Sequence, residues 1–185
     1  MTKAQLTVLA GPTAVGKGTV VAALTKRFPT LNVSISATTR DPRPGELNGV
    51  HYYFVSTQEF DAMIERGDML EWALVHGKNK YGTPRGPVDE ALAAGTPVLL
   101  EIDLAGARQV RTTRPDAQFI FLAPPSWEEL ERRLIGRGTE SPEEQARRLA
   151  TARVELEAAS EFDHVVINDD VERAVDELAR LIGLE

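Results

Sequence analysis

The sequence predicts an α/β fold in which an open, mostly parallel sheet is covered by helices on both faces. Apolar runs of strand length alternate with segments of helical periodicity, and runs such as 97–102 and 118–122 are apolar throughout, as in strands covered on both faces. A glycine-rich loop joins the first expected strand to the first expected helix. The stretches 36–86 and 126–160 break the alternation, so we interpret them as insertions into this core.

Length and composition restrict the function classes. The chain has 185 residues, enough for one domain with small insertions, and its 42% hydrophobic and 26% charged residues are typical of a soluble globular protein. It has no cysteine, which excludes disulfides and zinc–thiolate sites. We find neither a signal-peptide pattern nor an apolar run that could span a bilayer, so we expect a cytoplasmic protein. The net charge of −7 argues against broad binding to nucleic acid or anionic membranes.

The first part of the chain predicts a strand, a helix and a second strand. Residues 5–10 form an apolar run that ends at Gly11, which indicates a buried strand entering a turn. Apolar residues then recur every four positions, which predicts a helix over 17–27. Alternation over 32–36 predicts a short strand.

The first insertion is looped and aromatic. Two prolines and two glycines make 41–49 a loop, and the aromatic and β-branched stretch 50–55 is expected to be a strand. Thr57 is the expected cap of a helix that ends at Gly67. After it, a short helix is expected between Pro87 and Gly95.

The last part of the chain adds three helices and one strand. Serines followed three residues later by a glutamate predict capping boxes at the start of two helices. These pairs are Ser126 with Glu129, opening a helix over 127–135, and Ser141 with Glu144, opening one over 142–160. An apolar strand is expected over 164–167, and Asp169 with Glu172 is expected to open an amphipathic terminal helix.

The glycine-rich loop has the spacing of a phosphate-binding loop. Its glycines let backbone N–H groups converge, the following helix adds its positive end, and Lys17 reaches the β- and γ-phosphates. Gly18 stands where the standard pattern has Ser or Thr, so direct contact of a hydroxyl with Mg²⁺ stays open. The context favours a P-loop three-layer core over an incidental glycine-rich turn. The expected ATP-binding loop is Gly11, Pro12, Thr13, Ala14, Val15, Gly16, Lys17, Gly18 and Thr19.

A second motif lies in the first insertion. Arg40 and Arg43 are three apart in a proline-stiffened loop, with hydroxyls before them and Tyr52 after them. Two guanidiniums and a phenol can converge on one phosphate through charge-assisted hydrogen bonds. The alternative is an ordinary polar surface turn.

The chain resembles guanylate kinases, the nucleoside monophosphate kinases that phosphorylate GMP, almost from end to end. The shared motifs, in order, are the phosphate loop, 36–46, Leu70-Glu71-Trp72, Tyr81-Gly82-Thr83-Pro84, Glu101-Ile102-Asp103 with Gly106, Arg137-Gly138-Thr139-Glu140 and Asn168-Asp169-Asp170. The resemblance implies a core (1–35, 87–125 and 161–185), a mixed α/β GMP-binding region (36–86) and a helical lid (126–160). It also implies ATP and GMP as partners, with Mg²⁺, in a monomer or homodimer.

The resemblance assigns roles to residues that match the family. The GMP phosphate would be held by Arg40, Arg43, Tyr52 and Tyr81, and the guanine by Ser36, Glu71, Thr83 and Asp103. A carboxylate at Glu71 would accept from guanine N1–H and the 2-amino group, which adenine lacks. Arg133, Arg137 and Arg148 would close over the phosphates, Arg148 also reaching GMP, and together with Lys17, Arg40 and Arg43 they form the expected catalytic set. Asn168 would lie near the adenine of ATP, or it would be the N′ or cap residue of the last helix.

Two departures from the family and three functional alternatives stay open. Ala105 stands where the family often has Gln, and the Ala73–Tyr81 segment is one residue longer than in many relatives, which bears on Tyr81 and Thr83. Thr19 and Glu101 are the residues that could orient Mg²⁺ through water. The alternatives are a phosphopeptide-binding module of the same fold, a different acceptor, and dGMP as a secondary substrate. Arg132, Arg147 and Arg153 are expected to be solvated, and His51, His76 and His164 structural.

Overall fold

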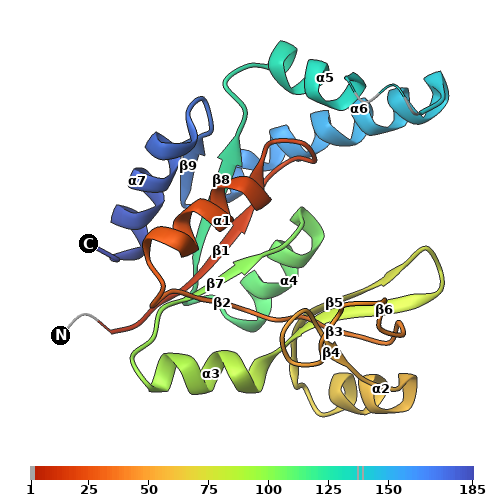
Figure 1. The fold of residues 1–185 in the computed structure, drawn as a ribbon, viewed down its shortest axis with the longest axis vertical. Coiled ribbons are helices and arrows are strands. Elements are labelled where there is room, and N and C mark those ends of the chain that lie inside the picture. The colour runs from red at the N-terminus through yellow and green to blue at the C-terminus, as the bar shows by residue number, and fades with distance from the viewer. Residues whose placement is uncertain (1–2, 137, 139) are drawn as a thin grey trace.

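The computed structural model describes residues 3–136, 138 and 140–185, which form two sheets and their covering helices (Figure 1). One sheet has five parallel strands in the order β2-β7-β1-β8-β9. These strands are β1 (Leu6–Ala10), β2 (Asn32–Val33), β7 (Val98–Glu101), β8 (Gln118–Ala123) and β9 (His164–Ile167). The predicted α/β fold with a mostly parallel sheet is confirmed.

Helices cover both faces of this sheet. Helices α1 (Lys17–Arg27) and α7 (Val171–Ile182) pack on one face, and α3 (Arg85–Ala93) and α4 (Leu104–Thr113) pack on the other. The side chains of β1 alternate between the two layers: Leu9 contacts the α1 and α7 side, while Leu6 and Val8 contact α3 and α4. This alternation makes three layers around two apolar clusters.

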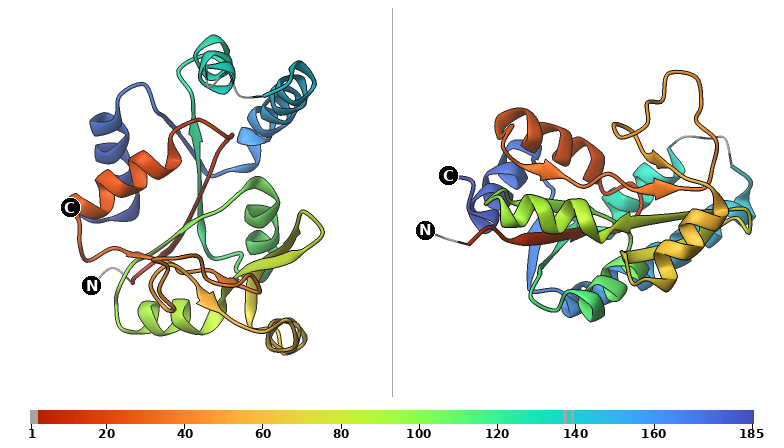
Figure 2. Two further views of the ribbon diagram at one scale, coloured as in Figure 1. Left: turned by 45° about the vertical axis from the view of Figure 1, so that its right-hand side comes forward. Right: turned by 90° about the horizontal axis from the view of Figure 1, so that it is seen from below.

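The first insertion forms a second, smaller sheet of four strands in the order β4-β3-β6-β5. Its strands are β3 (Ala37–Thr38), β4 (Tyr53–Phe54), β5 (Met69–Val75) and β6 (Asn79–Pro84). Helix α2 (Thr57–Glu65) buries Phe60 against Ala37 and Met69. The loop between β3 and β4, orange in Figure 2, projects away from this sheet.

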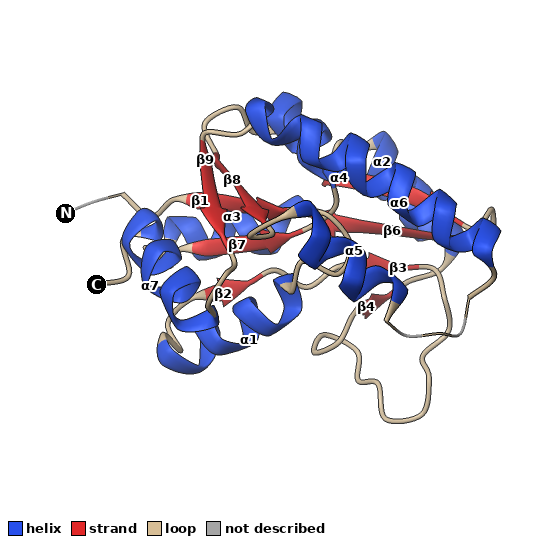
Figure 3. Ribbon diagram, turned by 90° about the horizontal axis from the view of Figure 1, so that it is seen from above, coloured by secondary structure: helices blue, strands red, loops and turns tan. Residues whose placement is uncertain are grey.

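The second insertion is a pair of helices above the core (Figure 3). Helices α5 (Trp127–Ile135) and α6 (Pro142–Glu157) pack through Leu130, Leu134 and Ala152, and a short 3-10 turn (Ala158–Glu161) returns the chain to the sheet. Arg153 is exposed, as the sequence predicts for a solvated arginine, and its guanidinium lies 3.9 Å from the centre of the Trp127 ring. Figure 1 shows that this pair and the smaller sheet extend to the same side of the core.

Several predicted boundaries differ from the structure. The strands expected over 32–36 and 50–55 are reduced to the two-residue strands β2 and β4. Helix α3 begins at Arg85, two residues before Pro87, and α6 ends at Glu157 rather than at 160. A strand of two residues at the edge of a sheet is too short for an alternation of apolar and polar side chains to show where it begins and ends.

The predicted caps are partly wrong. Ser56 caps α2 and Asp170 caps α7, each one residue away from the predicted Thr57 and Asp169. The capping box at Ser141 is present in both directions. At Ser126 only the serine accepts its backbone N–H, because the Glu129 carboxylate binds two arginines of its own helix.

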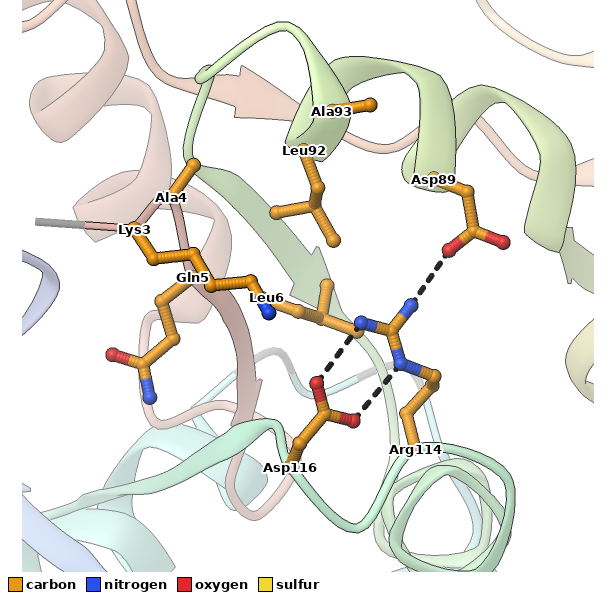
Figure 4. Close-up of a pocket in the computed structure, with 9 residues that line it drawn as sticks. All are labelled: Lys3, Ala4, Gln5, Leu6, Asp89, Leu92, Ala93, Arg114 and Asp116. Atoms are coloured by element: carbon orange, nitrogen blue, oxygen red, sulfur yellow. Dashed lines mark hydrogen bonds and ion pairs between the residues drawn. The ribbon is translucent and has the colours of Figure 1, made fainter.

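The ends of the strands opposite the phosphate loop carry a compact ion cluster (Figure 4). The Arg114 guanidinium donates to both Asp116 carboxylate oxygens, at 3.0 and 3.1 Å, and to Asp89 at 2.6 Å. These contacts join α3, the end of α4 and the residues before β8, at the rim of a hollow also lined by Lys3 and Leu92. Within the described part of the chain, no helix is long and apolar enough to cross a membrane.

Candidate active site

The phosphate-binding loop connects the carboxyl end of β1 to α1. A Cβ atom at Gly11 would lie 2.4 Å from the Leu122 carbonyl oxygen, so the loop can approach β8 only with glycine there. Gly16 has φ +96° and Ala14 has φ +68°, two left-handed residues that curl the loop tightly. The first turn of α1 has no acidic residue, so no carboxylate of that turn offsets the positive end of the helix dipole, which faces the loop.

Lys17 lies inside this loop. Its ammonium donates to the carbonyls of Gly11, at 3.2 Å, and Ile102, at 3.3 Å. Burial lowers the pKa of Lys17, and the nearby charge of Glu101 acts in the opposite direction. A partly desolvated ammonium held at the mouth of the loop can bind an anion strongly, because little water remains to be displaced from it.

The loop is also held from outside. The carbonyl oxygen of Val15 accepts from Asn168 Nδ2 at 2.8 Å and from Arg133 Nη1 at 3.2 Å. Asn168 follows β9, and Arg133 lies on α5. The N-cap of α7 is Asp170 and its N′ residue is Asp169, so the alternative that Asn168 is the N′ or cap residue of the last helix is wrong.

The four residues expected to read guanine lie on or next to β3, β5, β6 and α4, beside the core. Glu71 on β5 pairs with Thr83 on β6, and the Thr83 hydroxyl donates to Glu71 Oε1 at 2.7 Å. Ser36 immediately precedes β3, whose residues pair with β6, so its position continues the same row across the sheet. Asp103 caps α4 by accepting from the Gly106 N–H at 2.7 Å.

Glu71 and Asp103 approach each other at the amino end of α4. A Cβ at Gly106 would lie 3.1 Å from Asp103 Oδ1 and 3.2 Å from Glu71 Oε2, so glycine keeps both carboxylates against the helix. Burial raises the pKa of Glu71, and the charge of Asp103 raises it further, against the hydrogen bond from Thr83. The result is a buried acceptor site for paired N–H donors.

The residues expected to hold a GMP phosphate gather at the other end of the same strands. Arg40 Nε donates to the Tyr81 hydroxyl at 3.3 Å, and the Arg40 guanidinium lies 5.4 Å from the centre of the Tyr52 ring. Its two terminal nitrogens both donate to Glu46, at 3.0 Å each. Arg40 is therefore oriented by Tyr81 and Glu46 together, and most of its five donors are occupied within the chain.

The remaining arginines are spread over the loop and the lid. The Arg43 N–H donates to Glu46 at 2.8 Å, and among the described residues its guanidinium forms no ion pair. Arg148 on α6 lies 2.6 Å from Glu140, which ties it to the start of the lid helix. Arg137 lies outside the described residues.

The carboxylate of Glu101, at the end of β7, suits a magnesium ion that is held mainly by ATP and water. Glu101 Oε1 lies 4.0 Å from the point where a side chain at Gly18 would begin, so a carboxylate faces the position where the standard loop has a hydroxyl. Carboxylate oxygen is a preferred ligand of Mg²⁺, which commonly keeps several waters. Thr19 is exposed on α1.

Sequence reasoning missed three residues of this region. Glu155 on α6 is half-buried, and burial raises its pKa, while Lys17 lowers it and Asp103 raises it. The Gln109 amide binds both backbone groups of Trp72, at 2.9 and 3.0 Å, and so joins α4 to β5. Glu46 lies within a quoted motif, but only the structure links it to Arg40. None of the three carries a local sequence signal, since each partner is distant along the chain or on a loop.

Comparisons with known proteins agree with this site. A family model described as guanylate kinase matches residues 3–185. The curated guanylate kinases of Thermobifida fusca and Cutibacterium acnes are 61% and 59% identical to this chain. These matches cover 97% and 96% of this chain and 91% and 89% of the two relatives.

Solved structures give the same result. The crystal structure of guanylate kinase from Anaplasma phagocytophilum has a TM-score of 0.74 and 31% identity, covering 99% of this chain and 86% of that one. A shikimate kinase from Bacteroides thetaiotaomicron has a TM-score of 0.51 at 14% identity and shares the fold alone. The family model spans nearly all of the sequence and the relatives are matched over most of their length, so the chain belongs to the guanylate kinase family.

Proposed function

We propose that the chain transfers the γ-phosphoryl group of ATP to GMP, giving ADP and GDP. The observation that carries this proposal is the buried carboxylate of Glu71, held by Thr83 and facing Asp103 at the amino end of α4. Guanine presents N1–H and a 2-amino group as adjacent donors, whereas adenine has an acceptor at N1 and only a C–H at position 2. A site that leaves buried acceptors unpaired with the wrong base discriminates strongly.

The donor side is proposed to act by charge and position. The residues proposed to bind ATP are Gly11, Pro12, Thr13, Ala14, Val15, Gly16, Lys17, Gly18, Thr19, Arg133, Arg137 and Asn168. The loop N–H groups and Lys17 hold the β- and γ-phosphates. Mg²⁺, oriented by Glu101 and Thr19 through water, would neutralise part of the phosphate charge.

The acceptor side brings the GMP phosphate to the donor. Ser36, Glu71, Thr83 and Asp103 read the base, and Arg40, Arg43, Tyr52, Tyr81 and Arg148 hold the phosphate. A phosphate oxygen of GMP forms a bond to the γ-phosphorus while the bond from that phosphorus to the β–γ bridging oxygen breaks. Lys17, Arg40, Arg43, Arg133, Arg137 and Arg148 offset the charge repulsion, so no covalent nucleophile is needed. In this proposal 36–86 is the GMP-binding region, 126–160 the lid, and the rest the core.

The experiment that tests the proposal is an ADP-release assay with ATP and Mg²⁺, offering GMP, AMP, CMP and UMP separately at equal concentration. A large preference for GMP is expected, and dGMP offered in the same series measures whether the 2′-hydroxyl matters. Activity with none of them, while ATP still binds, would contradict the proposal. That outcome would favour a phosphopeptide-binding module, against which the intact phosphate loop and its Lys17 argue.

A further inference from the structure

One peptide of the phosphate-binding loop is held by side chains from two distant parts of the chain. The Val15 carbonyl accepts from Asn168 at 2.8 Å and from Arg133 at 3.2 Å. Asn168 is only 4% exposed, and its amide is the closer of the two donors. A buried amide directed at a single backbone carbonyl fixes the orientation of that peptide plane.

The orientation of the carbonyl determines where the next N–H points. The chain has no cis peptide bond in its described part, so the Val15 carbonyl and the Gly16 N–H point in opposite directions. With the carbonyl turned outward to Asn168, the Gly16 N–H is turned to the inner side of the loop. Gly16 is the N-cap of α1, so this N–H joins the donors at the start of the helix.

Gly16 is constrained by the same contact. Its φ of +96° lies in the left-handed region, and a Cβ there would lie 2.8 Å from Asn168 Nδ2. The glycine therefore permits both the backbone turn and the close approach of the asparagine amide. A side chain at position 16 would therefore have to displace the Asn168 amide or the Val15–Gly16 peptide.

We infer that Asn168 is a positioning residue of the donor site, which fixes the Val15–Gly16 peptide so that the Gly16 N–H faces the phosphates of ATP. The inference rests on the ATP side of the proposed function and is independent of the acceptor. The bond to Val15 uses one of the two N–H groups of the Asn168 amide. The expectation that Asn168 contacts adenine is therefore a separate one, which the test below distinguishes from the positioning role. Arg133 supports the same carbonyl from α5 and also binds Glu129 through its Nε at 3.1 Å.

The test compares the binding of ATP with that of inorganic triphosphate, which has no adenine, to the full chain without GMP. Asn168→Ala is expected to weaken both ligands by the same factor, about three- to tenfold, as for the loss of one hydrogen bond. Weaker binding of ATP with unchanged binding of triphosphate would show an adenine contact and overturn the inference. Unchanged binding of both ligands would overturn it as well.

The matched control is Asn32→Ala, which removes an exposed asparagine of β2 and is expected to leave both affinities unchanged. Thermal unfolding of each variant checks that the fold is kept. Both binding measurements omit GMP, so they test the role of Asn168 even if the protein shows no activity with GMP.

Asn168→Asp supplies a second variant of the same size if the alanine variant does not fold. A protonated carboxyl can donate to the Val15 carbonyl, and an ionised one cannot. The affinity of this variant for triphosphate, relative to the unchanged protein, is expected to rise as the pH falls through the carboxyl pKa. If Asn168→Ala folds, the affinity of Asn168→Asp for triphosphate at low pH should exceed that of Asn168→Ala. A ratio that does not rise with falling pH would contradict the inference.

Discussion

The Thr83 hydroxyl donates to Glu71 Oε1 at 2.7 Å, across the β5–β6 pair. Glu71 is 9% exposed, and its other oxygen is directed at the amino end of α4 beside Gly106. The carboxylate is therefore fixed from both sides before any ligand contact is considered. A preoriented acceptor loses little conformational freedom when paired donors bind it.

Glu71→Gln is expected to reduce kcat/KM for GMP by about 10²- to 10⁴-fold. The amide has nearly the same size, but it presents a donor where guanine also presents one, at a cost of roughly 1–3 kcal/mol for each unpaired group. Steady-state kinetics with GMP measure the loss. ATP affinity should not change, and a variant that keeps full activity with GMP would exclude Glu71 from base recognition.

The pH dependence of GMP binding and of stability should oppose each other at Glu71. Burial raises its pKa above the ordinary 4.5, and the charge of Asp103 adds to the shift. GMP binding needs the ionised form, so affinity should fall as the pH drops through the raised pKa. The contribution of Glu71 to the free energy of unfolding is greatest at low pH and is lost as the pH rises through the same pKa.

The two trends are measured separately on the unchanged protein and on Glu71→Gln. Binding titrations follow the first trend and denaturant unfolding follows the second, each measured from below the ordinary pKa of 4.5 up to neutral pH. Neither trend should appear in the glutamine variant. The same pH dependence in both proteins would assign it to another group.

Lys17→Met is expected to lower kcat by about 10²- to 10³-fold, as for loss of one preorganised charge at a developing anion. The ammonium is bound to the carbonyls of Gly11 and Ile102, so the change also removes two hydrogen bonds inside the loop. Lys26→Met, at an exposed position in the last turn of α1, is the control and should keep full activity. Comparable losses in both variants would indicate a general effect of charge.

Glu46 should make the β3–β4 loop sensitive to acid. Hydrogen bonds from the Arg40 side chain and the Arg43 N–H lower the pKa of Glu46 from 4.5 to about 2. Because the folded pKa is lowered, the stabilisation is complete above the unfolded value and is lost as the pH falls from 4.5 to about 2.

The measurement is the difference in unfolding free energy between the unchanged protein and Glu46→Gln over this range of pH. The difference should shrink toward zero as the pH falls. Glu65→Gln, at an exposed carboxylate on α2 with no ion pair among the described residues, should show no such change. A difference that stays constant in acid would contradict the assigned role of the Arg40–Glu46 pair.

Most strands and helices of the core can be predicted from the sequence, because buried strands are short apolar runs and their covering helices are amphipathic. Apolar runs such as 118–122 and the amphipathic face of α7 are local patterns, and both elements are where the sequence predicts them. Helix α4 was not predicted. Its sequence, Leu104–Thr113, has three charged or amide side chains and a low apolar content, and its stability comes from the Asp103 cap and from packing on β1 and β5.

The site was predicted as a set of residues, and its internal contacts were not. The motif positions identify Arg40 and Tyr81, but the choice of Glu46 as the partner of Arg40 depends on how the loop folds back. The sequence offers two roles for Asn168, and the structure adds a contact with Val15, 153 residues away in the sequence. Hydrogen bonds over such separations depend on the tertiary fold, which no local pattern encodes.

The contact between Gln109 and Trp72 should stabilise the junction between the core and the smaller sheet. The Gln109 side chain donates to the Trp72 carbonyl at 2.9 Å and accepts from the Trp72 N–H at 3.0 Å, so it satisfies both backbone groups of one residue of β5. Gln109→Leu keeps the size of the side chain and leaves both groups without these partners. The expected loss is about 1–3 kcal/mol of unfolding free energy, or about 2–4 °C in Tm for each kcal/mol.

Denaturant unfolding and calorimetry measure this loss. Gln58→Leu, an exposed glutamine on α2, is the matched control and should change stability by less than about 0.5 kcal/mol. Because β5 carries Glu71, the Gln109 variant should also raise the KM for GMP more than it lowers kcat. Equal stability of the two glutamine variants would mean that water replaces the Gln109 amide at this edge of the strand, and that the smaller sheet is held to the core by its apolar contacts alone.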